Sequence, residues 1–132
     1  GCREGERYPA ILLIHGWRGV NRHRPQGLAR EYLNLKPHQE YLRQHYVVFS
    51  GEYYADYLGD SQEFHSMAAA LKAMATIPQV DPQRIGCVGH SVGGLRSAYL
   101  AALDDRIKAA VVCGWMCSFP NQLAKHVRKD VA

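Results

Sequence analysis

The chain has 132 residues, of which 47% are apolar and 21% charged, and its formal net charge at pH 7 is +4. This length and composition suit one globular domain, and we treat residues 1–132 as that single domain. No stretch approaches the roughly 18 consecutive apolar residues of a membrane span, so we expect none. The chain opens Gly-Cys-Arg-Glu-Gly without a targeting segment, which leaves the compartment undetermined.

The basic residues and the cysteines do not suggest a nucleic-acid or metal site. One predicted loop gathers four basic side chains without interleaved aromatic residues, which favours a solvated loop over a nucleic-acid surface: Arg18, Arg22, His23 and Arg24. The four cysteines and seven histidines form no zinc-binding pattern. We therefore expect no nucleic-acid partner, no metal and no required disulfide.

Apolar runs and helical patterns alternate along the chain. Consecutive apolar residues, typical of strands covered on both faces, predict strands over 10–14, 46–49, 85–88 and 107–113. Residues 61–76 have a 3.6-residue apolar period, with Asp60 and Glu63 as a capping box. Further helices are predicted over 37–45 and 93–103 and, less distinctly, over 121–131, with a shorter turn around 26–34. This order predicts an α/β three-layer sandwich with a mainly parallel sheet of about four strands.

Three unusual loops follow the predicted strands. They cover residues 15–17, 89–91 and 113–115, with the sequences His-Gly-Trp, Gly-His-Ser and Cys-Gly-Trp. Ligands of parallel α/β sheets bind beyond the carboxyl ends of the strands. We therefore expect the three loops to converge on one rim.

The middle loop carries a candidate nucleophile. Gly89-His90-Ser91-Val92-Gly93 follows a predicted strand and opens a predicted helix, which is the context that the G-x-S-x-G pattern requires. A sharp turn exposes the serine oxygen but crowds the residues two before and two after it, and glycine relieves that crowding. His90 is not expected to act as the base, because neighbours on a tight turn point apart.

Two longer segments carry a family resemblance. RYPAILLIHGWRG and VDPQRIGCVGHSVGGLRSAYLAALDDRIKAAV resemble the central part of the α/β-hydrolases and, among their branches, dienelactone hydrolases and acetylxylan esterases. The resemblance extends from about residue 8 to residue 120. It implies Ser91 as the nucleophile, the backbone N–H groups of Trp17 and Val92 as the oxyanion hole, and no cofactor. It also implies the motif glycines, which are Gly16, Gly89 and Gly93.

The same resemblance assigns supporting places to two histidines and leaves the catalytic base unassigned. His90 is expected to pack beneath the turn, and His15 to support its own loop. In the family an acid and then a histidine follow the serine. Asp104 and Asp105 are expected at the opposite rim, and Asp130 follows His126 instead of preceding it. We therefore expect an internal fragment whose acid and histidine lie outside the chain, with His126 as the weaker alternative base.

The leading functional hypothesis is a serine hydrolase that acts on small-molecule carboxylic esters through an acyl-enzyme intermediate. One alternative is a non-catalytic or inactive, truncated α/β-hydrolase-like chain. A less favoured alternative is an acyl-carrier acyltransferase, which shares the G-H-S-x-G serine but carries Glu where this chain has Gly94. The sequence leaves the natural ester and the oligomeric state open.

Overall fold

The structure is a computed structural model that describes residues 3–16, 33–50 and 61–115, except for the side chains of residues 61–64. The predicted helix over 121–131 lies outside this part of the chain, as does most of the predicted turn over 26–34. The proposed capping box, formed by Asp60 and the Glu63 side chain, also lies outside it.

In the described part of the chain, four parallel strands form one sheet in the order β2-β1-β3-β4. The strands are β1 (Tyr8–Ile14), β2 (Val47–Ser50), β3 (Val80–His90) and β4 (Ile107–Cys113). Each predicted apolar run forms one of them, so the predicted parallel sheet is confirmed. The central strands β1 and β3 are bonded on both sides, which places their carboxyl ends side by side.

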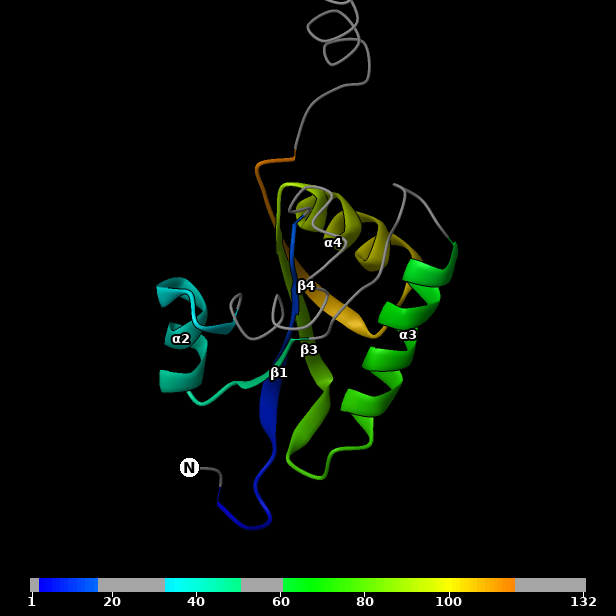
Figure 1. Cartoon of the computed structure of the whole chain (residues 1–132). Helices are drawn as coiled ribbons and strands as arrows, with labels where there is room; N and C mark the ends of the chain where they lie inside the picture. Colours follow the sequence, from blue (N-terminus) through cyan, green and yellow to red (C-terminus); the bar gives the residue numbers. More distant parts are fainter. Residues whose placement is uncertain (1–2, 17–32, 51–60, 116–132) are drawn as a thin grey trace, which may run out of the picture.

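Helices cover both faces of this sheet. Figure 1 shows α2 (Lys36–Arg43) on one side, and α3 (Ser61–Ala75) and α4 (Val92–Leu103) on the other. Pro37 lies in the first turn of α2, where its missing N–H costs no intrahelical hydrogen bond. The three layers confirm the predicted α/β sandwich.

The core lies between the central strands and α3. Leu12 and Ile14 of β1 are fully buried, and so are Met67, Leu71 and Met74 of α3. Their spacing along α3 is that of one helical face, as the apolar period predicts. Burying each of these side chains contributes about 1.5–3 kcal/mol, so this face of α3 fixes the helix against the sheet.

Two features of the sheet differ from the predictions. The expectation that β4 is covered on both faces is wrong, because Ala109, Ala110 and Val111 are exposed. Within the described residues β4 pairs only with β3, and such an edge position is not encoded in the apolar run itself. In addition, β3 begins at Val80, five residues earlier than predicted.

The early part of β3 pairs irregularly with β1. Tyr8 pairs with Val80, whereas Ala10 already pairs with Ile85, so the residues between Val80 and Ile85 leave the ladder. Pro82 lies among them and cannot donate a ladder hydrogen bond. The regular ladder therefore begins at Ile85 and continues to the carboxyl end, where the candidate site lies.

Candidate active site

Ser91 lies at the turn between β3 and α4, in a backbone conformation that side chains disfavour. Its φ is 57° and its ψ is −125°. The Ser91 N–H donates to the Cys113 carbonyl over 2.8 Å, and the Ser91 carbonyl accepts from the Leu95 N–H over 3.2 Å. These bonds attach the turn to β4 and to the first turn of α4. A residue held in such a conformation costs of order 1–3 kcal/mol, which the surrounding contacts must offset.

The Ser91 hydroxyl is not used in capping the helix. Serine before a helix commonly accepts a hydrogen bond from a backbone N–H of the first turn. Ser91 occupies the N-cap position of α4 but makes no such side-chain bond. Ser91 as a whole is half-buried.

Glycines around Ser91 allow the backbone segments to approach closely. A methyl group on Gly89 would lie 2.0 Å from the Gly93 carbonyl oxygen, and one on Gly93 would lie 2.1 Å from the Ile14 carbonyl oxygen. Real side chains essentially never come so close to backbone atoms. Only glycine fits at either position, and α4 consequently begins directly against the end of β1.

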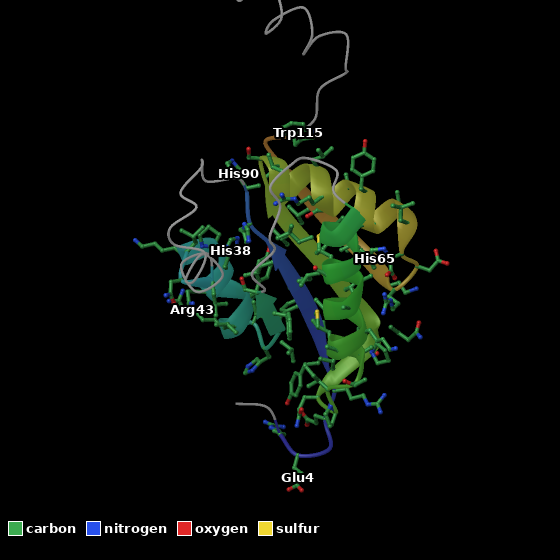
Figure 2. All side chains as sticks on the ribbon, turned by 45° about the vertical axis from the view of Figure 1, so that its right-hand side comes forward. Glu4, His38, Arg43, His65, His90 and Trp115 are labelled. Carbon is green, nitrogen blue, oxygen red and sulfur yellow. The ribbon has the colours of Figure 1, made fainter. Side chains whose placement is uncertain are left out.

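The other two loops approach the same turn. A methyl group on Gly16 would lie 2.9 Å from the His90 carbonyl oxygen and 3.5 Å from the Ser91 Cβ. One on Gly114 would lie 3.6 Å from the Ser91 backbone nitrogen. Figure 2 shows His90 and Trp115 at one end of the sheet. The described parts of the three loops therefore converge on one rim; Trp17 lies outside the described residues.

The two histidines of this rim have different environments. His90 is exposed, so the expectation that it packs beneath the turn is wrong. Its ring lies against Gly114, where an added methyl group would lie 3.2 Å from Nε2. His15 is buried, and its Nδ1 lies 3.0 Å from the Gly16 carbonyl oxygen. His15 is thus part of the support of its own loop.

The backbone N–H of Val92 has no acceptor within its own helix. Val92 is the first residue of α4, and the first N–H groups of a helix have no intrahelical acceptor. The positive end of the helix dipole adds to their attraction for an anion. Only one of the two expected oxyanion donors, Val92, lies among the described residues.

Cys87 of β3 is a potential rival nucleophile. It is fully buried, and its Sγ lies 3.6 Å from the Ser97 carbonyl oxygen. Burial raises the pKa of the Cys87 thiol to about 11. A thiol with this pKa stays protonated at neutral pH and is a poor nucleophile, so Cys87 does not compete with Ser91 in this role.

Among the described residues, the acidic residues that follow Ser91 in the chain do not lie near it. Asp104 caps the opposite end of α4, and Asp105 follows it; the 12-residue helix makes that end about 18 Å distant. The Arg106 guanidinium donates from Nε to Oδ1 of Asp104 over 2.8 Å and holds the pKa of this carboxyl below its usual value. His126 and Asp130 lie outside the described residues.

Sequence reasoning missed one buried charge near the turn. Arg96 of α4 is 5% exposed, and its Nη1 donates to the His15 carbonyl over 3.2 Å. The sequence did contain one indication that Arg96 lies near the turn: Arg96 follows Gly93 by three residues and therefore lies on the same face of the helix. An apolar period does not reveal such a residue, since arginine is normally exposed.

No metal-binding cluster or membrane-spanning helix is found in the described part of the chain. Among those residues, no three His, Cys, Asp or Glu side chains could jointly hold a metal ion. None of the described helices is long and apolar enough to cross a membrane.

Two proteins of Bacillus subtilis (strain 168) are similar in sequence. YtaP, which carries a provisional assignment as a hydrolase, is 48% identical over 59 residues, covering 45% of this chain and 18% of YtaP. YuxL, described as an uncharacterized peptidase, is 30% identical over 139 aligned positions, covering 97% of this chain and 20% of YuxL. The chain thus spans about a fifth of the length of these relatives.

Solved structures and a family model complete the comparison. DcsB, solved in complex with its substrate analogue, shares the fold at a TM-score of 0.57 and 20% identity, over 95% of this chain and 44% of DcsB. The hypothetical protein PA2218 of Pseudomonas aeruginosa has a TM-score of 0.54 and 25% identity, over 82% of this chain and 34% of that protein. The model of the dienelactone hydrolase family matches residues 2–130, so this chain belongs to the dienelactone hydrolase family.

Proposed function

We propose that this chain carries the nucleophile of a serine hydrolase that acts on small carboxylic esters. The observation that carries the proposal is the conformation of Ser91, with φ at 57° and its hydroxyl uninvolved in capping α4. Strained backbone of this kind persists where the surrounding structure enforces it, and it clusters at active sites. Membership of the dienelactone hydrolase family supports the same reading.

In the proposed reaction, Ser91 Oγ attacks the carbonyl carbon of the ester while its proton passes to a histidine base. The tetrahedral oxyanion accepts hydrogen bonds from the Val92 N–H and from the Trp17 N–H. Its collapse breaks the bond to the leaving oxygen, which takes the proton from the histidine. Water then attacks the acyl-enzyme by the same route and releases the carboxylic acid. The histidine and its orienting carboxylate are not assigned to any described residue.

The proposed rate contribution of the oxyanion hole is large. A donor aimed at the developing oxyanion contributes about 2.7–4 kcal/mol in related chemistry. The Val92 N–H is a candidate for this donor, since Val92 directly follows the proposed nucleophile and its N–H has no intrahelical acceptor.

An amide substrate is the second candidate. It is favoured by the match to YuxL, which is described as a peptidase and aligns with 97% of this chain. Esters remain the primary proposal because the family model, which matches residues 2–130, is that of dienelactone hydrolases.

A fluorophosphonate probe tests the proposed nucleophile in the full-length protein. We expect one adduct, located on Ser91 by peptide mass spectrometry, and Ser91→Ala to lose both the adduct and at least about 10³-fold of ester turnover. Ser97→Ala is the matched control, because Ser97 lies two turns along α4 with its hydroxyl donating to the Gly93 carbonyl. The Ser97→Ala variant should still form the fluorophosphonate adduct on Ser91.

Absence of an adduct on Ser91 in the wild-type protein would overturn the proposal. A labelled protein that cleaves a peptide p-nitroanilide but not p-nitrophenyl acetate would instead select the amide substrate.

A further inference from the structure

Arg96 joins two segments that are far apart in the sequence. Its guanidinium is buried, with 5% of the residue exposed, and Nη1 donates to the His15 carbonyl over 3.2 Å. His15 directly follows β1 and is itself buried. A positively charged donor makes a stronger hydrogen bond than a neutral one, and burial shields this bond from water.

A second contact fixes the same two segments. Gly93 lies one turn before Arg96, and a methyl group at Gly93 would lie 2.8 Å from the His15 carbonyl oxygen that Arg96 binds. The backbone of α4 thus lies directly against the His15 peptide, and Arg96 bonds to the oxygen of that peptide. Together the two contacts define where the chain leaves β1 relative to the start of α4.

The segment held in this way lies beside the candidate nucleophile. Gly16 follows His15, and its added methyl group would lie 3.5 Å from the Ser91 Cβ. A displacement of the His15 carbonyl would therefore also shift Gly16, which lies beside Ser91. The Ser91 turn itself is held separately, through the bond from its N–H to the Cys113 carbonyl.

We infer that Arg96 is a positioning residue, which holds the His15–Gly16 segment in register with Ser91 so that an attacked carbonyl group meets both the hydroxyl and the oxyanion donors. The inference rests on the proposed function. Positioning of this kind affects the transition state more than the bound substrate, because small misplacements of catalytic groups strongly lower the rate. Loss of Arg96 should consequently lower kcat and leave KM nearly unchanged.

The chain offers a matched control at the other end of β1. Arg84 donates from Nη2 to the Arg7 carbonyl over 3.2 Å, so it also binds a backbone oxygen next to β1. The Arg84 side chain is 55% exposed and pairs with Asp81. Arg84→Met removes an equivalent bond to the chain before β1 without touching the rim that carries Ser91.

The test compares Arg96→Met, Arg96→Gln, Arg96→Lys and Arg84→Met in the full-length protein, with p-nitrophenyl acetate as substrate and a fluorophosphonate as probe. Met has no hydrogen-bond donor, and Gln has a shorter, uncharged side chain; both should lower kcat and the rate of Ser91 labelling by about 10–100-fold, with KM within about threefold. Lys keeps a charged donor, and its kcat should lie between those of Met and the wild type. Arg84→Met should keep wild-type kcat, and melting temperatures separate loss of rate from loss of fold.

The possible outcomes are distinguishable. Wild-type protein without a Ser91 adduct overturns the proposed function, and this inference falls with it. With a labelled wild type, wild-type kcat in folded Arg96→Met or Arg96→Gln overturns the inference alone. If neither of these variants folds, Arg96 serves folding and the inference is likewise overturned.

Discussion

The two ends of the sheet are built in different ways. At the carboxyl end, backbone lies against backbone: Gly89, Gly93 and Gly16 each lie where a methyl group would come within 2.9 Å of a carbonyl oxygen. At the amino end, ion pairs between exposed or partly exposed side chains predominate, such as Arg84–Asp81 and Arg106–Asp104. Figure 2 shows the contrast in position, with His90 at one end and Glu4 at the other.

This difference indicates that the carboxyl end of the sheet holds its backbone positions more rigidly than the amino end does. Ion pairs at the surface tolerate movement and contribute little stability each, typically up to about 1 kcal/mol. Close backbone contacts tolerate almost no movement, because protein interiors are densely packed. The strained Ser91 is found at the tightly packed end, where its neighbours can hold it in place. Substitutions at the two ends should therefore differ in size and in kind.

The largest effect is expected from Gly89→Ala. Its methyl group would lie 2.0 Å from the Gly93 carbonyl oxygen and 2.5 Å from the Ser97 hydroxyl, so the turn must open. We expect a loss of more than about 3 kcal/mol in the free energy of unfolding, together with loss of fluorophosphonate labelling at Ser91. Thermal or urea unfolding and the labelling assay measure the two effects.

Gly86→Ala is the control within the same strand. Its methyl group would lie 3.1 Å from the Ala109 carbonyl oxygen, a distance that a small shift of exposed β4 can relieve. We expect stability within about 1 kcal/mol of the wild type and continued labelling of Ser91. Equal losses for the two alanine variants would contradict the view that the carboxyl end is the sterically constrained one.

An intermediate effect is expected from replacing Ser91 itself. Ser91→Gly and Ser91→Ala both remove the hydroxyl, but only glycine relaxes the strain at φ 57°. Relief of about 1–3 kcal/mol is partly offset by the extra unfolded-state entropy of glycine, about 0.5–1 kcal/mol. Ser91→Gly should thus be more stable than Ser91→Ala by about 1 kcal/mol, with both inactive. Equal melting temperatures would mean that the strain at Ser91 does not exceed the entropic cost of glycine and would contradict this prediction.

Much of this architecture was predictable from local sequence patterns. The apolar runs predicted the strands, and the period that places Met67, Leu71 and Met74 on one face predicted α3. These patterns suffice because each depends on residues within one element. The crowding at Gly89 and Gly93 could also be anticipated, since a serine turn of this shape leaves no space for side chains there.

The remaining features depend on neighbours that are distant in the sequence. Val111 lies on β4, at the opposite edge of the sheet from β2, on which α2 packs, so its exposure depends on where the helices lie over the sheet. The exposure of His90 and the burial of Arg96 likewise depend on where Gly114 and His15 lie in space. A run of apolar residues or a single charge in a helix does not encode these contacts.

The smallest effect is expected at the amino end, from Asp104→Asn. Arg106 holds the pKa of the Asp104 carboxyl below its usual value. The ion pair therefore stabilises the fold at pH values above the unfolded-state pKa, which is near 4. This stabilisation is lost as the pH falls through the lower pKa of the folded state. Because the Arg106 side chain is 37% exposed, we expect a loss of less than about 1 kcal/mol at pH 7.

Melting temperatures of the wild type and Asp104→Asn should therefore differ at pH 7 and converge as the pH falls through the lowered pKa of Asp104. Asp105→Asn, which makes the same change of charge at the exposed neighbouring residue, is the matched control and should show a smaller difference. Ester turnover at neutral pH should be unchanged in both variants, because this end of α4 lies about 18 Å from Ser91. A folded Asp104→Asn variant without turnover would place its carboxylate in the catalytic site and would remove the functional distinction between the two ends of the sheet.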